Sequence, residues 1–298
     1  EIRHLRIKKL ELNDELIASL DVNVSTKTFN ISSEKESNAG VNFGIGYVAS
    51  FLIYMFIFLY GAQVMRGVIE EKTSRIVEVV ISSVKPFQLM LGKVLGVATV
   101  GLTQFLIWII LMFAVSTFAA SMFGAESMNA MGNANTAELQ EQMQDQEKAT
   151  EIIQAIQNTP VFQIISLFVF YFLGGYLLYA ALFAMVGSAV DSEADSQQFM
   201  LPITIPLLLA IFSLAPVLSD PNGQLAFWLS MIPFTSPVVM MGRIAYGVPF
   251  WQIALSMFLL ICGFIFTTWF AARVYRVGIL IHGTKVNYKV LFKWFMQS

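Results

Sequence analysis

Five stretches of the chain contain no Asp, Glu, Lys or Arg and are long enough to cross a bilayer. They run over about residues 43–65, 94–118, 161–190, 199–218 and 250–272. At about 1.5 Å of rise per residue, a helix of about 20 apolar residues covers a hydrocarbon core of about 30 Å. The pattern therefore predicts an all-α polytopic membrane protein with five transmembrane helices in this chain.

The composition agrees with this pattern and excludes other classes of protein. Of 298 residues, 56% are hydrophobic and 13% are charged, whereas soluble domains carry about 25% charged residues. This excludes an ordinary soluble enzyme and a nucleic-acid binder. The single cysteine, Cys262, and the two histidines exclude an intrachain disulfide and a Cys- or His-rich metal site.

The basic residues predict the orientation. Segments 66–93 and 273–298 hold five Lys and Arg residues each, whereas segments 119–160 and 219–249 hold one each. Cytoplasmic loops carry the excess of Lys and Arg, so we expect a multi-pass protein with a cytoplasmic C-terminus. Residues 1–40 then lie outside, as the tail of an extracytoplasmic domain, and residues 41–298 form the transmembrane domain. This topology predicts a sixth, N-terminal span upstream of the chain.

Segment 66–84 reads as one amphipathic cytoplasmic helix. Its apolar face consists of Ile69, Thr73, Ile76, Val80 and Val84. Glu71, Arg75 and Glu78 lie on the opposite face, and Glu71 and Arg75 have the i,i+4 spacing of an ion pair. Such a helix either lies in the membrane interface or docks its charged face on a soluble partner. Composition does not separate the two.

Two segments contain prolines at membrane depth. Pro202 and Pro206 interrupt the fourth stretch, which is either a kinked helix beside a pathway or a bent packing helix. Segment 219–249 is apolar but broken by Pro233 and Pro237, which predicts an extracytoplasmic re-entrant segment. Arg243, the only charge between Asp220 and Arg273, is either a snorkelling anchor or a gate residue.

The other two connections have simpler interpretations. Segment 119–160 is acidic and rich in Gln, which indicates a solvated extracytoplasmic loop. The tail 273–298 places Lys285, Lys289 and Lys293 four residues apart beside apolar residues. This spacing predicts a cytoplasmic interfacial helix.

The spans lack the chemistry of several transporter classes. None of the five stretches contains an ionisable Asp, Glu, His, Lys or Arg, and carriers driven by ion gradients usually bury such groups. Segment 278–285, GILIHGTK, has the glycine spacing of a phosphate loop but ends in Thr-Lys where Lys-Ser/Thr is required. Any ATP chemistry must therefore belong to another chain, and this chain is not an enzyme.

Several short segments, taken together, resemble one family. They are residues 70–78 (EEKTSRIVE), 82–90 (SSVKPFQLM), 92–96 (GKVLG), 193–198 (EADSQQ), 232–237 (IPFTSP), 240–243 (MMGR) and 276–283 (RVGILIHG). They resemble permease subunits of type-2 ABC exporters, in particular the NatB-like branch, over about residues 43–295. The resemblance implies six helices per subunit, a second permease subunit (identical or related) beside it, and two ABC ATPase subunits beneath.

The resemblance also assigns roles. It makes segment 66–84 the coupling helix, with Glu70, Glu71, Arg75 and Glu78 as the expected ATPase contacts. The residues expected to line or gate the pathway are Pro202, Pro206, Pro233, Pro237 and Arg243. This chain would bind no cofactor, because ATP and Mg²⁺ belong to the partner ATPase. We expect a bacterial cytoplasmic (inner) membrane protein of unspecified cargo. The alternative is a channel or a membrane scaffold without an ATPase partner.

Overall fold

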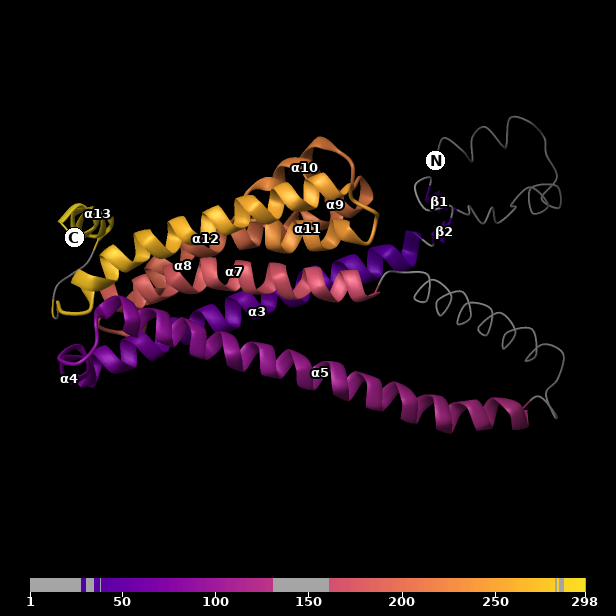
Figure 1. The fold of residues 1–298 in the computed structure, drawn as a ribbon, viewed down its shortest axis with the longest axis horizontal. Helices are drawn as coiled ribbons and strands as arrows, with labels where there is room; N and C mark the ends of the chain where they lie inside the picture. Colours follow the sequence, from indigo (N-terminus) through magenta and orange to yellow (C-terminus); the bar gives the residue numbers. More distant parts are fainter. Residues whose placement is uncertain are drawn as a thin grey trace, which may run out of the picture. The chain divides into compact units, whose positions relative to one another are not determined.

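The computed structural model divides the chain into two compact units, residues 1–38 and residues 39–298. It describes residues 28–30, 35–37, 39–130, 161–281, 283 and 287–297. In the first unit, these residues form an antiparallel pair of strands, β1 (Thr28–Asn30) and β2 (Lys35–Ser37). The described part of the second unit is helical (Figure 1).

The second unit has five helices that are long and apolar enough to cross a membrane, as predicted. They are α3 (Ala39–Thr73), α5 (Pro86–Ala130), α7 (Val161–Ala189), α8 (Glu193–Phe212) with its continuation α9 (Leu214–Ser219), and α12 (Phe250–Gly278). With 35 residues, α3 is about 52 Å long. It therefore projects beyond a hydrocarbon core of about 30 Å.

Helix α5 differs from the prediction at its C-terminal end. It continues through residues 119–130, which we assigned to the extracytoplasmic loop 119–160. This stretch contains no proline and is rich in Ala and Met, which are strong helix formers, so nothing local ends the helix at Phe118. The rest of that loop, residues 131–160, lies outside the described residues.

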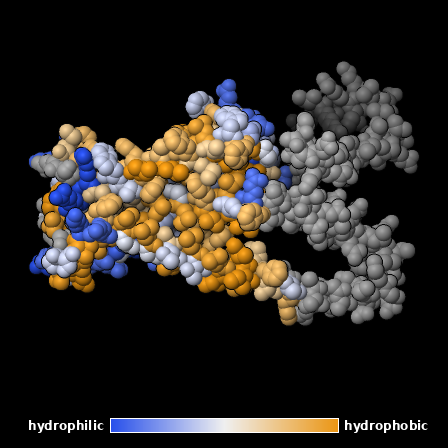
Figure 2. Space-filling model, viewed as in Figure 1, coloured by the Kyte–Doolittle hydropathy of each residue, from blue (hydrophilic) through white to orange (hydrophobic). Residues whose placement is uncertain are grey.

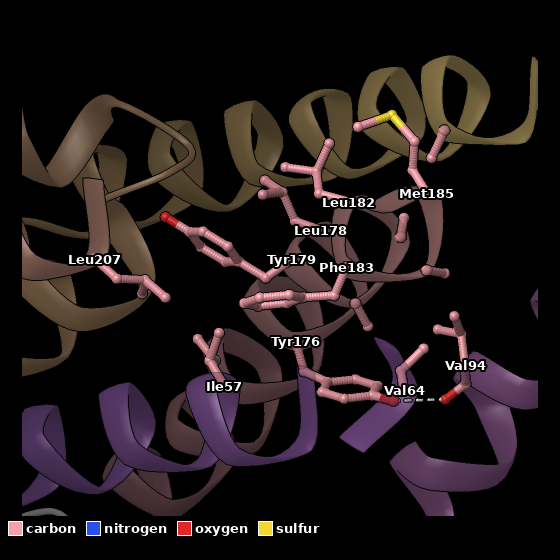
Figure 3. Packing of buried hydrophobic residues seen from close by; sticks show 14 of the residues in the cluster. Ile57, Val64, Val94, Tyr176, Leu178, Tyr179, Leu182, Phe183, Met185 and Leu207 are labelled. Carbon is pink, nitrogen blue, oxygen red and sulfur yellow. Dashed lines mark hydrogen bonds between the residues drawn. The ribbon is translucent and has the colours of Figure 1, made fainter. Parts of the chain in front are cut away.

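Helix α7 lies at the centre of the second unit. It packs against α3, α5, α8 and α12, and against the short helix α11 (Ser236–Ile244). All residues from 178 to 190 are buried, as is typical of a helix that is apolar on every side. Figure 3 shows side chains of α7 between α3 and α12, with the Tyr176 hydroxyl reaching the backbone of Val94 on α5.

Two glycines let α7 approach its neighbours closely. A Cβ atom on Gly175 would lie 2.7 Å from Ile57 Cδ1 and 2.8 Å from Pro237 Cβ. A Cβ atom on Gly187 would lie 2.7 Å from the Met65 carbonyl oxygen of α3. Small residues at such crossings allow helices to pack backbone to backbone in a membrane.

The short helices lie at the two ends of the bundle. Helices α4 (Ile76–Ile81) and α13 (Tyr288–Gln297) lie where α3 and α12 end, and we call this the α4 end. Helices α9, α10 (Gln224–Met231) and α11 lie together at the other end, the α10 end (Figure 1). Hydrophilic residues gather at the α4 end, and apolar side chains cover much of the surface between the ends (Figure 2).

Candidate functional site

The predicted helix 66–84 is interrupted, and this part of the prediction was wrong. Helix α3 ends at Thr73, and α4 begins at Ile76 after a break at Ser74 and Arg75. Arg75 has a left-handed backbone conformation with φ of 55°. The Thr73 and Ser74 hydroxyls donate to backbone carbonyls of the last turn of α3, including that of Glu70, and thereby cap it.

The break changes which apolar residues face the bundle. Val77 is 1% exposed, whereas Ile76 and Val79 are 53% and 73% exposed. The apolar stripe expected from an unbroken helix is therefore not continuous. Instead, α4 together with the break and the last turn of α3 presents a mixed surface of charged and apolar side chains. We call it the α4 surface, and its members are Glu70, Arg75, Ile76, Glu78 and Val79.

Of the four expected coupling residues, three are exposed and the fourth, Glu71, is half-buried and paired with a neighbouring helix. Glu70, Arg75 and Glu78 belong to the α4 surface. The Glu71 carboxylate lies 2.7 Å from the Lys93 ammonium of α5 instead of pairing with Arg75. The predicted Glu71–Arg75 pair was wrong because the left-handed turn at Arg75 ends the helical register that the i,i+4 spacing requires.

An ion pair with a buried lysine involves the last turn of α3, next to the α4 surface in sequence. The Lys72 ammonium lies 2.9 Å from Asp191 Oδ1 and donates to the Ser188 carbonyl at 2.8 Å. Asp191 Oδ2 also accepts a hydrogen bond from the Gly283 backbone N–H at 2.6 Å. With Glu71 and Lys93, these groups tie the last turn of α3 to α5, to the α7–α8 connection and to the segment after α12.

This cluster, which we call the α3 junction, was missed by sequence reasoning. In the sequence, Lys72 contributed only to the basic charge of segment 66–93, and no role was predicted for Asp191. One signal was available, because Asp191 ends a run of 39 residues without charge, 152–190. A lone carboxylate at that place needs a cation partner when the chain around it is buried. The partner, 119 positions away in the sequence, was not deducible.

Arg243 is buried at the α10 end and ties three segments together. Its Nε donates to the Pro221 carbonyl at 2.7 Å, and its guanidinium nitrogens donate to Ser230 of α10 and, at 2.9 Å, to Gln252 of α12. The side chain is 1% exposed, so the snorkelling-anchor interpretation was wrong. The acceptors are a carbonyl, a hydroxyl and an amide oxygen, all uncharged, and they hold α10 and α12 against α11.

The four prolines occupy different surroundings. Pro202 and Pro206 lie within α8, which continues through both of them, and Pro202 is exposed. Pro233 separates α10 from α11 and lies 2.5 Å from a Cβ built on Gly263 of α12. Pro237 is buried in the first turn of α11 against Gly175. In this conformation Pro233 and Pro237 are packing residues.

The charges of the second unit are strongly asymmetric. Among its described Lys and Arg residues, all except Arg243 lie at the α4 end. Two more ion pairs are found there, Glu71 with Lys93 and Arg66 with Glu193. An apolar helical bundle with its basic residues at one end is the distribution that the positive-inside rule describes.

Sequence comparison identifies the family. The family described as ABC-2 family transporter protein matches residues 3–273. The chain is 31% identical over 288 residues to the uncharacterized protein YhaP of Bacillus subtilis, covering 95% of this chain and 63% of YhaP. It is 27% identical over 271 residues to the uncharacterized protein MJ1024 of Methanocaldococcus jannaschii, covering 91% of this chain and 57% of MJ1024.

The chain thus spans about three fifths of the length of these relatives. No solved structure matches it significantly. The match to the family covers the described membrane helices α3, α5, α7, α8 and nearly all of α12. With its five membrane-crossing helices, the chain belongs to the ABC-2 family of membrane transporter proteins.

Proposed function

We propose that this chain is the membrane-spanning permease subunit of an ATP-driven ABC exporter. ABC-2 permeases normally work with an ATPase partner, and the observation that carries the proposal is the α4 surface. There the helix of a membrane span projects beyond the bilayer, breaks at Arg75 and presents exposed charged and apolar side chains. Ile76 and Val79 are exposed on a helix of six residues, which offers a partner both an apolar contact and flanking charges.

The α4 end is cytoplasmic in this proposal. The support is the distribution of basic residues, since cytoplasmic segments of membrane proteins carry the excess of Lys and Arg. The C-terminus then lies in the cytoplasm of a bacterium whose inner membrane holds the transporter. ATP and Mg²⁺ bind to the partner ATPase, and a second permease subunit, identical or related, completes the pathway.

Coupling between the ATPase and the pathway runs through the α3 junction. A tilt of α4 acts on the last turn of α3, and the ion pairs of Lys72 and Glu71 connect that turn to α7–α8 and α5. Helix α7 is the buried centre of the bundle and packs against α3, α5, α8, α11 and α12. Because the packing is tight, a displacement at the end of α7 moves the helices in contact with it. ATP binding then shifts the population between two permease conformations.

The α10 end would be the exit side of the pathway. Helices α10 and α11 form the re-entrant segment of the proposal, and Arg243 holds them closed on α12 through its three hydrogen bonds. Opening of the pathway requires Arg243 to break these three hydrogen bonds and form others. Pro202 and Pro206 allow α8 to bend during this opening. The resemblance to the NatB-like branch stays a prediction, and the cargo is not specified.

The proposal is tested by photo-crosslinking from two exposed positions at opposite ends. A photoreactive residue at Val79 of α4 is expected to capture an ABC ATPase, whereas one at Trp228 of α10, which is also exposed, is not. Glu78→Lys should abolish the capture from Val79 because it reverses a charge of the α4 surface. Glu193→Lys, a charge reversal at the same end but outside that surface, is the control and should retain it.

The opposite result identifies the alternative. If Val79 captures only lipid in cells with normal expression, α4 is an interfacial helix. The chain would then be a channel or a membrane scaffold without an ATPase partner, and transport should survive Glu78→Lys.

A further inference from the structure

Helix α13 packs on the end of α12 with one face. Its Leu291 and Trp294 are buried, and Trp294 lies 3.2 Å from a Cβ built on Gly278. The Phe295 ring lies 4.9 Å from the Phe270 ring, centroid to centroid. These contacts place α13 beside residues 270–278, at the end of the membrane-crossing helix α12. The helix therefore lies at the level where a bilayer meets water.

The opposite face of α13 remains exposed and carries two parallel ridges. Lys289 and Lys293 form one ridge, and Phe292 and Met296 form the other, each pair spaced i,i+4. Phe292 and Met296 are 63% and 70% exposed. An exposed apolar ridge beside a basic ridge is the pattern of helices that lie in the plane of a membrane surface.

The surroundings of this face are cationic. The Arg273 guanidinium lies 4.4 Å from the centroid of the Trp269 ring, and Arg276 is exposed. No Asp or Glu follows Asp220 in the sequence. The carboxylate that meets the tail backbone, Asp191, is paired with Lys72 and accepts from Gly283. The lysines of α13 thus belong to a segment that supplies no carboxylate side chain of its own, and both are exposed.

We propose that the exposed face of α13, formed by Lys289, Phe292, Lys293 and Met296, binds the surface of a bilayer that contains anionic phospholipid. The lysine ammoniums contact lipid phosphates, and Phe292 and Met296 insert among the first acyl carbons. The position of α13 at the end of a membrane-crossing helix favours lipid over an acidic protein. The half-exposed Trp269 supports this, because tryptophan is enriched at membrane–water interfaces.

The test measures whether α13 is inserted, using the full chain without any ATPase. Cys262→Ser removes the only cysteine, and Met296→Cys then accepts an environment-sensitive fluorophore. The labelled protein is reconstituted in phosphatidylcholine vesicles with or without phosphatidylglycerol. The probe should report an apolar environment, quenched by spin-labelled acyl chains, in the anionic vesicles and much less in the neutral ones.

The variant Lys289→Gln/Lys293→Gln tests the charge. Each lysine near an anionic surface contributes roughly fivefold to binding, so the double variant should lower the equilibrium constant for insertion in anionic vesicles by roughly 25-fold. Lys85→Gln, an exposed lysine at the same end but outside α13, is the matched control and should change nothing. Equal insertion in both kinds of vesicle, no effect of the double variant, or crosslinking of position 296 to a protein would overturn the proposal. Since no ATPase is present, these outcomes leave the permease function untouched.

Discussion

The ion pair of Lys72 and Asp191 allows a quantitative test of the α3 junction, because its two members differ in burial. The Lys72 side chain is 1% exposed, whereas that of Asp191 is 34% exposed. The variant Asp191→Asn therefore leaves a buried ammonium with the Ser188 carbonyl but without its carboxylate. The variant Lys72→Met leaves a carboxylate that still reaches water and still accepts from Gly283.

These two changes should have unequal costs. Removing one partner of a buried ion pair costs about 3–5 kcal/mol, and we take about 3 kcal/mol for Asp191→Asn because the carboxylate is partly solvated. Lys72→Met keeps the volume of the side chain and should cost about 1 kcal/mol. The double variant leaves no uncompensated charge, so it should resemble Lys72→Met alone. In a chain of this size, about 1 kcal/mol corresponds to about 2–4 °C in the unfolding temperature.

The assay is thermal unfolding of the purified chain in lipid nanodiscs, followed by tryptophan fluorescence at a fixed scan rate. We expect decreases in unfolding temperature of about 6–12 °C for Asp191→Asn and about 2–4 °C for both Lys72→Met and the double variant. Glu193→Gln is the control, since its pair with Arg66 is 60–66% exposed and contributes at most about 1 kcal/mol. Equal losses for the two single variants, or a double variant less stable than Asp191→Asn, would refute the reasoning.

Three further substitutions, one with a matched control, test the packing of the bundle, two by thermal unfolding and one by hydrogen exchange. Gly187→Ala should destabilise the chain by about 2 kcal/mol or more, because the new Cβ would lie 2.7 Å from the Met65 backbone oxygen. Gly96→Ala is its control: a Cβ there has no atom within 4 Å, so this variant should be neutral or slightly stabilising. Tyr176→Phe removes the hydroxyl that donates to the Val94 carbonyl at 2.8 Å and should cost about 1 kcal/mol. Arg243→Lys cannot reproduce the three directed hydrogen bonds of the guanidinium. Hydrogen exchange of the backbone amides in α10 should therefore accelerate, while exchange in α7 stays unchanged. Unaltered exchange in α10 would show that Arg243 does not hold that helix.

The sequence was sufficient for the membrane-crossing architecture. A charge-free run of about 20 residues has one low-energy arrangement in lipid, a helix that pairs all its backbone groups internally. The five runs could therefore be located without knowing their neighbours. The resemblance of segments such as 70–78 and 240–243 to ABC-2 proteins was likewise readable from residues alone, and the match over residues 3–273 confirmed that family.

The coupling segment shows where local reasoning failed. Ile69, Ile76, Val80 and Glu71 have helical spacing, and no glycine or proline in segment 70–81 signals a break. The left-handed turn falls on Arg75, a residue that ordinarily avoids this conformation. The break accompanies the burial of Val77 and the pairing of Glu71 with Lys93, which lies on another helix. Contacts with other helices therefore outweigh local propensity here.

The sequence by itself determined which segments cross the membrane and which end carries the basic residues, because both depend on transfer free energies summed over single segments. Only the tertiary structure decided that Lys72 is buried beside Asp191, that Arg243 is an internal tie and that α13 turns two lysines outward. Each of these depends on which side of a helix meets another helix. The buried side of each helix is determined by packing between segments far apart in the chain, so it cannot be deduced from any one segment.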